Sequence, residues 1–206
     1  LINEQCGVSA SHAERPVSTP KAERSKVEFL LPVRFQNNRR VTAYLLSRGI
    51  DMSILDYCFQ HGLLYEAADY HNAVFVGYDG KTPRYATLRG TLSSSNFKRD
   101  VTGSNKRFCF SITGQDGGKL NVFECAIDAL SYLTQVKMQG ADWRQKSVLS
   151  LGGVYQSRPN ETPKVPTALQ GYLERHADVQ EIVLRLDNDA VGRGAASAIS
   201  QAISDL

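Results

Sequence analysis

The sequence has no apolar run long enough to span a membrane, and its first residues lack the basic leader and apolar core of a signal peptide. None of the four cysteines forms a C-x-x-C pair or has a histidine at zinc-finger spacing, which argues against a structural zinc site. Scattered cysteines suit a reducing compartment, so we expect a cytoplasmic protein with no membrane contact. Because the chain begins with Leu1, we expect a fragment of a longer protein.

The bulk composition is that of an ordinary soluble globular protein. The 206 residues are 42% hydrophobic and 22% charged, enough for one large domain or two small ones. A net charge of +3 is compatible with nucleic-acid binding but does not require it.

The pattern of residues divides the chain into three parts. Residues 1–37 are polar and contain prolines, which indicates an amino-terminal arm or linker. Residues 38–118 predict two helices separated by Gly49 and Asp51, and then a β-rich module with a hairpin over 73–90 and a strand over 107–114.

Residues 119–206 alternate strand and helix three times. The strands are expected over 119–124, 147–153 and 181–187, and the helices over 126–138, 167–177 and 190–203. This order predicts an α/β fold with a carboxy-terminal parallel sheet and helices on both faces, preceded by the helical hairpin and the small β-rich module.

Four carboxylates follow the ends of two of these strands. Glu124 ends the first strand, Asp128 lies one helical turn later, and Asp187 and Asp189 end the third strand. Sites in parallel sheets form at the carboxyl ends of strands, so these groups can meet. Like charges this close need a cation between them, and oxygen ligands suit Mg²⁺, with Mn²⁺ as a substitute.

This pattern predicts a Mg²⁺ site for phosphoryl chemistry, with Glu124, Asp187 and Asp189 as ligands and Asp128 as a further catalytic residue. The simpler alternative is that the Asp187–Asp189 pair only caps a helix beside a solvated turn. Arg193 either contacts phosphate or faces water. Gly192 and Gly194 are expected to allow close packing of helix on sheet.

The segments FECAIDALS (123–131), VLSLGG (148–153) and LRLDNDAVGRGAA (184–196) together resemble the Toprim domain. That domain is shared by bacterial primases, topoisomerases, OLD-type nucleases and RecR repair proteins. The position of Asp128 resembles the primase branch, and the resemblance implies metal binding by Glu124, Asp187 and Asp189. Cys125 departs from the usual glycine and narrows the approach of a phosphate backbone.

The upstream segments RRVTAYLLSRGID (39–51), HNAVFVGYDG (71–80), PRYATLRGT (83–91) and FKRDVTGSNKRFCF (97–110) resemble a second module. It precedes the Toprim domain in primase-like proteins of plasmids and conjugative transposons. The resemblance implies that basic residues of this region hold nucleic acid and nucleotide: Arg84, Arg89, Lys98, Lys106 and Arg107. Cations on both sides of the VTGSN turn suit a phosphate backbone. A solvated surface is the simpler alternative.

Together these features predict a Mg²⁺-dependent, primase-like nucleotidyltransferase that acts on DNA in mobile-element replication or transfer. The expected partners are single-stranded or duplex DNA, nucleoside triphosphates, and replication or transfer proteins of the element. One alternative is a Mg²⁺-dependent nuclease with Glu124 as general base. The other is a non-catalytic DNA-binding module.

Overall fold

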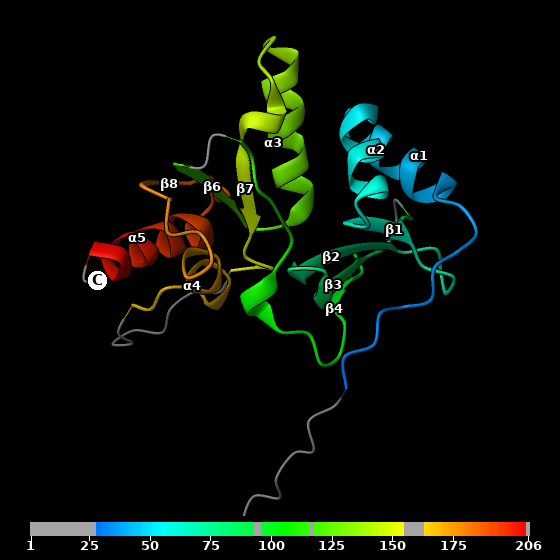
Figure 1. Cartoon of the computed structure of the whole chain (residues 1–206), viewed down its shortest axis with the longest axis horizontal. Helices are drawn as coiled ribbons and strands as arrows, with labels where there is room; N and C mark the ends of the chain where they lie inside the picture. The colour runs from blue at the N-terminus through cyan, green and yellow to red at the C-terminus, as the bar shows by residue number, and fades with distance from the viewer. Residues whose placement is uncertain (1–27, 93–95, 116–117, 155–162, 205–206) are drawn as a thin grey trace, which may run out of the picture.

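The computed structural model describes residues 28–92, 96–115, 118–154 and 163–204 (Figure 1). Most of the predicted arm, with Cys6, lies outside these residues. The three cysteines of the described part, Cys58, Cys109 and Cys125, are free thiols. No helix in this part is both long enough and apolar enough to cross a bilayer.

The predicted helical hairpin is present. It consists of α1 (Arg39–Ser47) and α2 (Met52–Gln60). A four-stranded antiparallel sheet follows, in the order β1 (Leu64–Glu66), β2 (Ala73–Asp79), β3 (Thr82–Arg89) and β4 (Lys98–Asp100). The predicted hairpin turn lies between β2 and β3, where Gly80 has a φ of 57°. The α1–α2 hairpin packs on one face of this sheet through Leu64 and Phe75.

The second sheet has the order β5-β7-β6-β8. Its strands are β5 (Ser111–Ile112), β6 (Lys119–Phe123), β7 (Ser147–Ser150) and β8 (Glu181–Leu184). The three predicted strands β6, β7 and β8 are parallel, whereas β5 pairs antiparallel with β7 at one edge. The sheet is therefore mixed, and β6 lies at its centre with β7 and β8 as its neighbours.

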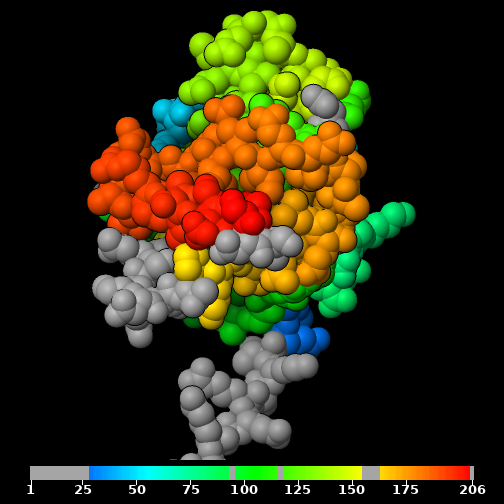
Figure 2. All heavy atoms as spheres, turned by 90° about the vertical axis from the view of Figure 1, so that its left-hand side faces the viewer, coloured from blue at the N-terminus to red at the C-terminus, as the bar shows by residue number. Residues whose placement is uncertain are grey.

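Helices cover both faces of the second sheet, which confirms the expected α/β architecture (Figure 1). They are α3 (Ala126–Met138), α4 (Thr167–Leu173) and α5 (Ala190–Ser204). Phe123 and Val148 pack toward α3, while Leu120, Val122 and Leu149 pack toward α4 and α5. Alternate residues of a strand point to opposite faces, so each strand contributes to both cores. Figure 2 views the molecule from the side of α5, which lies at the surface.

The strand predicted over 107–114 is wrong in its first half. The chain forms a 3-10 turn, η1 (Lys106–Phe108), before it enters β5. The Asn105 side chain accepts a hydrogen bond from the Arg107 N–H at 3.1 Å and caps this turn. The alternation of phenylalanines resembles a strand, but Phe110 is buried in one core and Phe108 packs at the edge of the other. A second 3-10 turn, η2 (Trp143–Gln145), precedes β7.

The two sheets share their cores. One core combines Val41 and Ile54 of the helical hairpin with Leu130 of α3. The other includes Tyr85 of the first sheet together with Val122 of the second. The division of the chain at 118/119 remains a prediction. The strand β5 precedes this boundary in sequence, although it pairs with β7 in the second sheet.

Asp51 joins the helical hairpin to α3. Its carboxylate accepts hydrogen bonds from the Ser53 N–H at 2.8 Å and from the Lys137 ammonium at 2.6 Å. Its own N–H donates to the Thr134 hydroxyl at 3.1 Å. The hydrogen bond from Lys137 and that from Ser53 lower the pKa of Asp51 from 3.8 to about 2.

We expect Asp51→Ala to lower the free energy of unfolding by about 1–2 kcal/mol at pH 7, because the helix loses its cap. A carboxyl group whose pKa is lowered by folding stabilises the protein above its unfolded pKa of about 3.9. That contribution should therefore vanish as the pH falls toward about 2. Urea unfolding of both proteins across this range measures it. Asp56→Ala, an exposed site on the same helix, is the control. A difference that does not change with pH would contradict the prediction.

Candidate functional site

The predicted meeting of Glu124 and Asp187 occurs because β6 and β8 are neighbours in register. Val122 of β6 aligns with Leu184 of β8, and the Arg185 N–H donates to the Val122 carbonyl at 2.8 Å. The segments that follow β6 and β8 then leave the sheet at the same edge. There the Asp187 N–H donates to Glu124 Oε1 at 3.1 Å across a sequence separation of 63 residues.

The environment of Glu124 disfavours its negative charge. Burial of this half-exposed carboxyl group raises its pKa, and the charges of Asp187, Asp189 and Asp128 raise it further. The hydrogen bond from the Asp187 N–H opposes this shift. All four carboxylates identified from the sequence therefore interact electrostatically, and a cation would relieve their repulsion.

The structure separates Asp189 from the other three carboxylates. Asp128, in the first turn of α3, lines the same pocket as Glu124 and Asp187. The Asp189 carboxylate instead accepts a hydrogen bond from the Gly192 N–H at 2.7 Å and caps α5, and it is not among the pocket residues. The simpler alternative from the sequence, a helix cap, therefore describes the contact that Asp189 makes.

The donor set suits Mg²⁺ better than a metal that needs a complete protein cage. Among the described residues, no three His, Cys, Asp or Glu side chains lie close enough to enclose an ion by themselves. Mg²⁺ commonly uses one or two carboxylates and completes its shell with water and substrate phosphates. The carboxylates of Glu124 and Asp187, which line the same pocket, fit that requirement.

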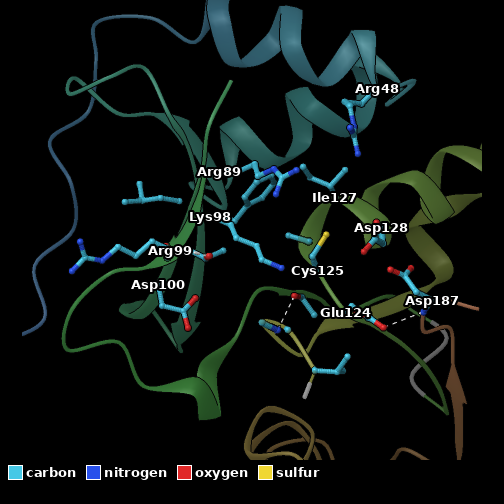
Figure 3. A pocket seen from close by; sticks show the side chains of 18 residues that line it. Arg48, Arg89, Lys98, Arg99, Asp100, Glu124, Cys125, Ile127, Asp128 and Asp187 are labelled. Carbon is cyan, nitrogen blue, oxygen red and sulfur yellow. Dashed lines mark hydrogen bonds between the residues drawn. The ribbon is translucent and has the colours of Figure 1, made fainter. Parts of the chain in front are cut away.

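A pocket of about 480 Å³ lies between the two sheets, with carboxylates on one wall and, apart from Asp100, cations on the other. The carboxylates Glu124, Asp128 and Asp187 come from the second sheet. Arg48, at the end of α1, and Arg89 and Lys98, on β3 and β4, face them from the other side (Figure 3). Lys98 points toward Cys125 at the centre, and Cys125 is exposed there. The arrangement can hold an anion beside a bound cation.

Four of the predicted nucleic-acid contacts lie outside the pocket. Arg84 is 4.0 Å from Asp79, and Arg107 forms an ion pair with Glu174. Arg193 donates to the Asn188 carbonyl at 2.8 Å. Lys106 is the fourth, and it donates to the Gly152 carbonyl at 3.1 Å.

Sequence analysis missed Arg48 as a pocket residue. Its position depends on the packing of α1 against α2 and β1, for which the local sequence carries no signal. Arg99 also contributes to the lining, but its side chain points away from Lys98 and from the carboxylates (Figure 3). Arg48, Lys98 and Arg99 form no ion pair with any carboxylate of the described residues.

Two family models match the chain in succession. Residues 121–205 match the model described as Toprim-like, so the chain carries a Toprim-like domain there. Residues 43–116 match a model described as a protein of unknown function, DUF3991. A comparison with curated proteins finds no significant match.

Two solved structures are similar to the chain. One is the DnaG primase catalytic domain bound to single-stranded DNA, with 13% identity and a TM-score of 0.46 over 77% of this chain and 57% of that one. The other is a DNA primase domain from Pseudomonas aeruginosa, with 16% identity and a TM-score of 0.40 over 77% of this chain and 50% of that one. The chain thus spans about half the length of these structures.

Gly192 allows the turn after Asp187 to close, whereas the sequence predicted a role in packing helix on sheet. A Cβ at Gly192 would collide with the Asp187 carbonyl oxygen, but one at Gly194 would meet nothing within 4 Å.

We expect Gly192→Ala to destabilise the protein by about 1–3 kcal/mol through this collision. Gly194→Ala should stabilise it by up to about 1 kcal/mol as a helix former. Urea unfolding distinguishes the two, and equal effects would contradict the prediction.

The Asp187 charge should be measurable at Glu124. We expect Asp187→Asn to lower the pKa of Glu124, because a like charge is removed while the backbone hydrogen bond stays. Titration of ¹³C-labelled glutamate carboxyl groups by NMR, without metal, measures the change. Asp69→Asn, an exposed acid on the β1–β2 loop, serves as the control. The same pKa in wild type and Asp187→Asn would show that the two charges do not interact.

Proposed function

We propose that the chain is the core of a Mg²⁺-dependent, primase-like nucleotidyltransferase that acts on DNA. The observation that carries this proposal is the pocket in which Glu124, Asp128 and Asp187 face Arg89 and Lys98. Carboxylates on one wall and cations on the other suit a metal-bound polyphosphate. The Toprim-like match over 121–205 supports the same chemistry.

Glu124 and Asp187 would hold the metal, and Asp189 stays in the proposed ligand set because its charge acts on Glu124. When bound, Mg²⁺ or Mn²⁺ orients phosphate oxygens and offsets charge that develops in the transition state. Asp128 adds negative charge at the start of α3 and helps to place the cation. Its carboxylate lines the pocket beside Glu124.

Lys98 and Arg89 would bind phosphate groups of a nucleoside triphosphate or of a DNA strand, with Arg48 as a third cation. Arg89 is partly held already, because its Nε donates to the Tyr44 hydroxyl at 3.4 Å. A fixed guanidinium loses less freedom when it binds an anion than a free one does. Lys98 is exposed and is the most adaptable of the three.

Two observations favour other functions. The raised pKa of Glu124 suits a general base, which supports a nuclease that activates water. The helix-capping contact of Asp189 supports a non-catalytic DNA-binding module, because it engages one of the four carboxylates. Each alternative predicts a different product in the assay below.

The biological setting also belongs to this proposal. The free, buried thiols of Cys58 and Cys109 support a reducing, cytoplasmic location. The segments that resemble plasmid and conjugative-transposon proteins support a role in mobile-element replication or transfer, with other proteins of the element as partners. We also propose that 38–118 and 119–206 act as two modules.

We expect the wild-type chain to incorporate labelled nucleotides on a single-stranded DNA template in the presence of Mg²⁺. This activity should be lost with EDTA or in the Glu124→Gln variant. Lys98→Met should lower the activity by about 10- to 100-fold, because a hydrogen bond to a charged phosphate is lost. Arg99→Met is the matched control, since its side chain points away from the carboxylates, and should stay within about twofold. Plasmid nicking without nucleotides would establish the nuclease instead, and DNA binding without either activity would establish the scaffold.

A further inference from the structure

The turn that follows β7 lies directly beside Glu124. Gly152 and Gly153 have φ values of 66° and 99°, in the left-handed region that favours glycine. The Gly153 N–H donates to the Glu124 carbonyl at 2.8 Å, and the Leu151 N–H donates to the Phe123 carbonyl at 2.8 Å. The backbone that carries Glu124 is therefore held on one side by this turn, as it is on the other side by β8.

Tyr85 of the first sheet packs against the turn at Gly152. A Cβ at Gly152 would lie 2.6 Å from the Tyr85 hydroxyl and 3.2 Å from the Cys109 sulfur. Tyr85 is fully buried, and its hydroxyl donates to Asp100 Oδ1 at 2.7 Å. The turn can thus rest on Tyr85 only because residue 152 has no side chain, and Asp100 fixes the hydroxyl beneath it.

Lys106 holds the same turn from the side. Its ammonium donates to the Gly152 carbonyl at 3.1 Å and lies 3.4 Å from Asp100 Oδ2. Asp100 therefore connects the two supports, because it accepts from Tyr85 with one oxygen and faces Lys106 with the other. The sequence predicted a nucleic-acid contact for Lys106, whereas two of its three N–H donors face partners within the protein.

We infer that Asp100 and Lys106 are positioning residues that hold the Gly152–Gly153 turn against Glu124, and that Lys106 is not a DNA-phosphate contact. Two of the three N–H donors of the ammonium face a carbonyl and a carboxylate, and Asp100 offsets its charge, so a phosphate would compete with both partners. Lys98 has no such partners in the described part of the chain. The statement about DNA rests on the proposed function, whereas the mechanical role, which is to hold the turn in place, does not.

Hydrogen exchange of the metal-free protein tests the mechanical role. We expect Lys106→Met to accelerate exchange of the Gly153 amide about fivefold, which is the usual net effect of one hydrogen bond. Lys106→Arg should restore protection because it supplies a long donor again, and Asp100→Asn should give an intermediate rate. Lys98→Met should exchange like wild type. Wild-type exchange in Lys106→Met, or equal acceleration in Lys98→Met, would overturn the inference.

The salt dependence of single-stranded DNA binding tests the other half. One lost phosphate contact lowers the slope of log K against log salt concentration by about 0.7. We expect that decrease in Lys98→Met and an unchanged slope in Lys106→Met. A lower slope in Lys106→Met would overturn the inference in favour of direct phosphate contact. If the wild-type chain bound no DNA, the proposed function would fail, while the exchange rates would still decide the mechanical role.

Discussion

The hydrogen bond from the Asp187 N–H to the Glu124 carboxylate is the contact on which the candidate site depends. It forms because β6 lies between β7 and β8, so that two distant segments leave the sheet at one edge. Burial raises the pKa of Glu124, and the charges of the acids brought together here raise it further. A site that accumulates negative charge in this way is prepared for a cation, because binding one removes a cost that the folded protein already carries.

The pocket belongs to both sheets. Its acidic wall comes from the Toprim-like domain, and its basic wall comes from α1, β3 and β4. Shared cores fix these walls relative to each other: Tyr85 packs with Val122, and Ile54 packs with Leu130. A close-packed interior transmits displacement, so a shift of side chains in the first sheet displaces the turn beside Glu124.

The basic residues differ in what they can do because they differ in their partners. Arg107 is held by Glu174, and Lys106 by Asp100 and the Gly152 carbonyl. Lys98 faces the pocket without such partners in the described residues, while Arg99, next in sequence, points away from the carboxylates. Strand geometry alone separates these two neighbours, since consecutive side chains point to opposite faces. Positive charge in a sequence therefore indicates a candidate, and its surroundings decide its role.

Local patterns determined much of this protein. The spacing of apolar residues predicts α3 over the residues it occupies, and Asp79 with Gly80 predicts the hairpin turn. The ends of the parallel strands predict that Glu124 and Asp187 meet. These features depend on short-range periodicity and on the rule that parallel strands end together. Only the tertiary structure decided that Arg48 reaches the pocket and that Lys106 supports a turn. Those roles arise from contacts between segments that no local pattern relates, because packing sets them.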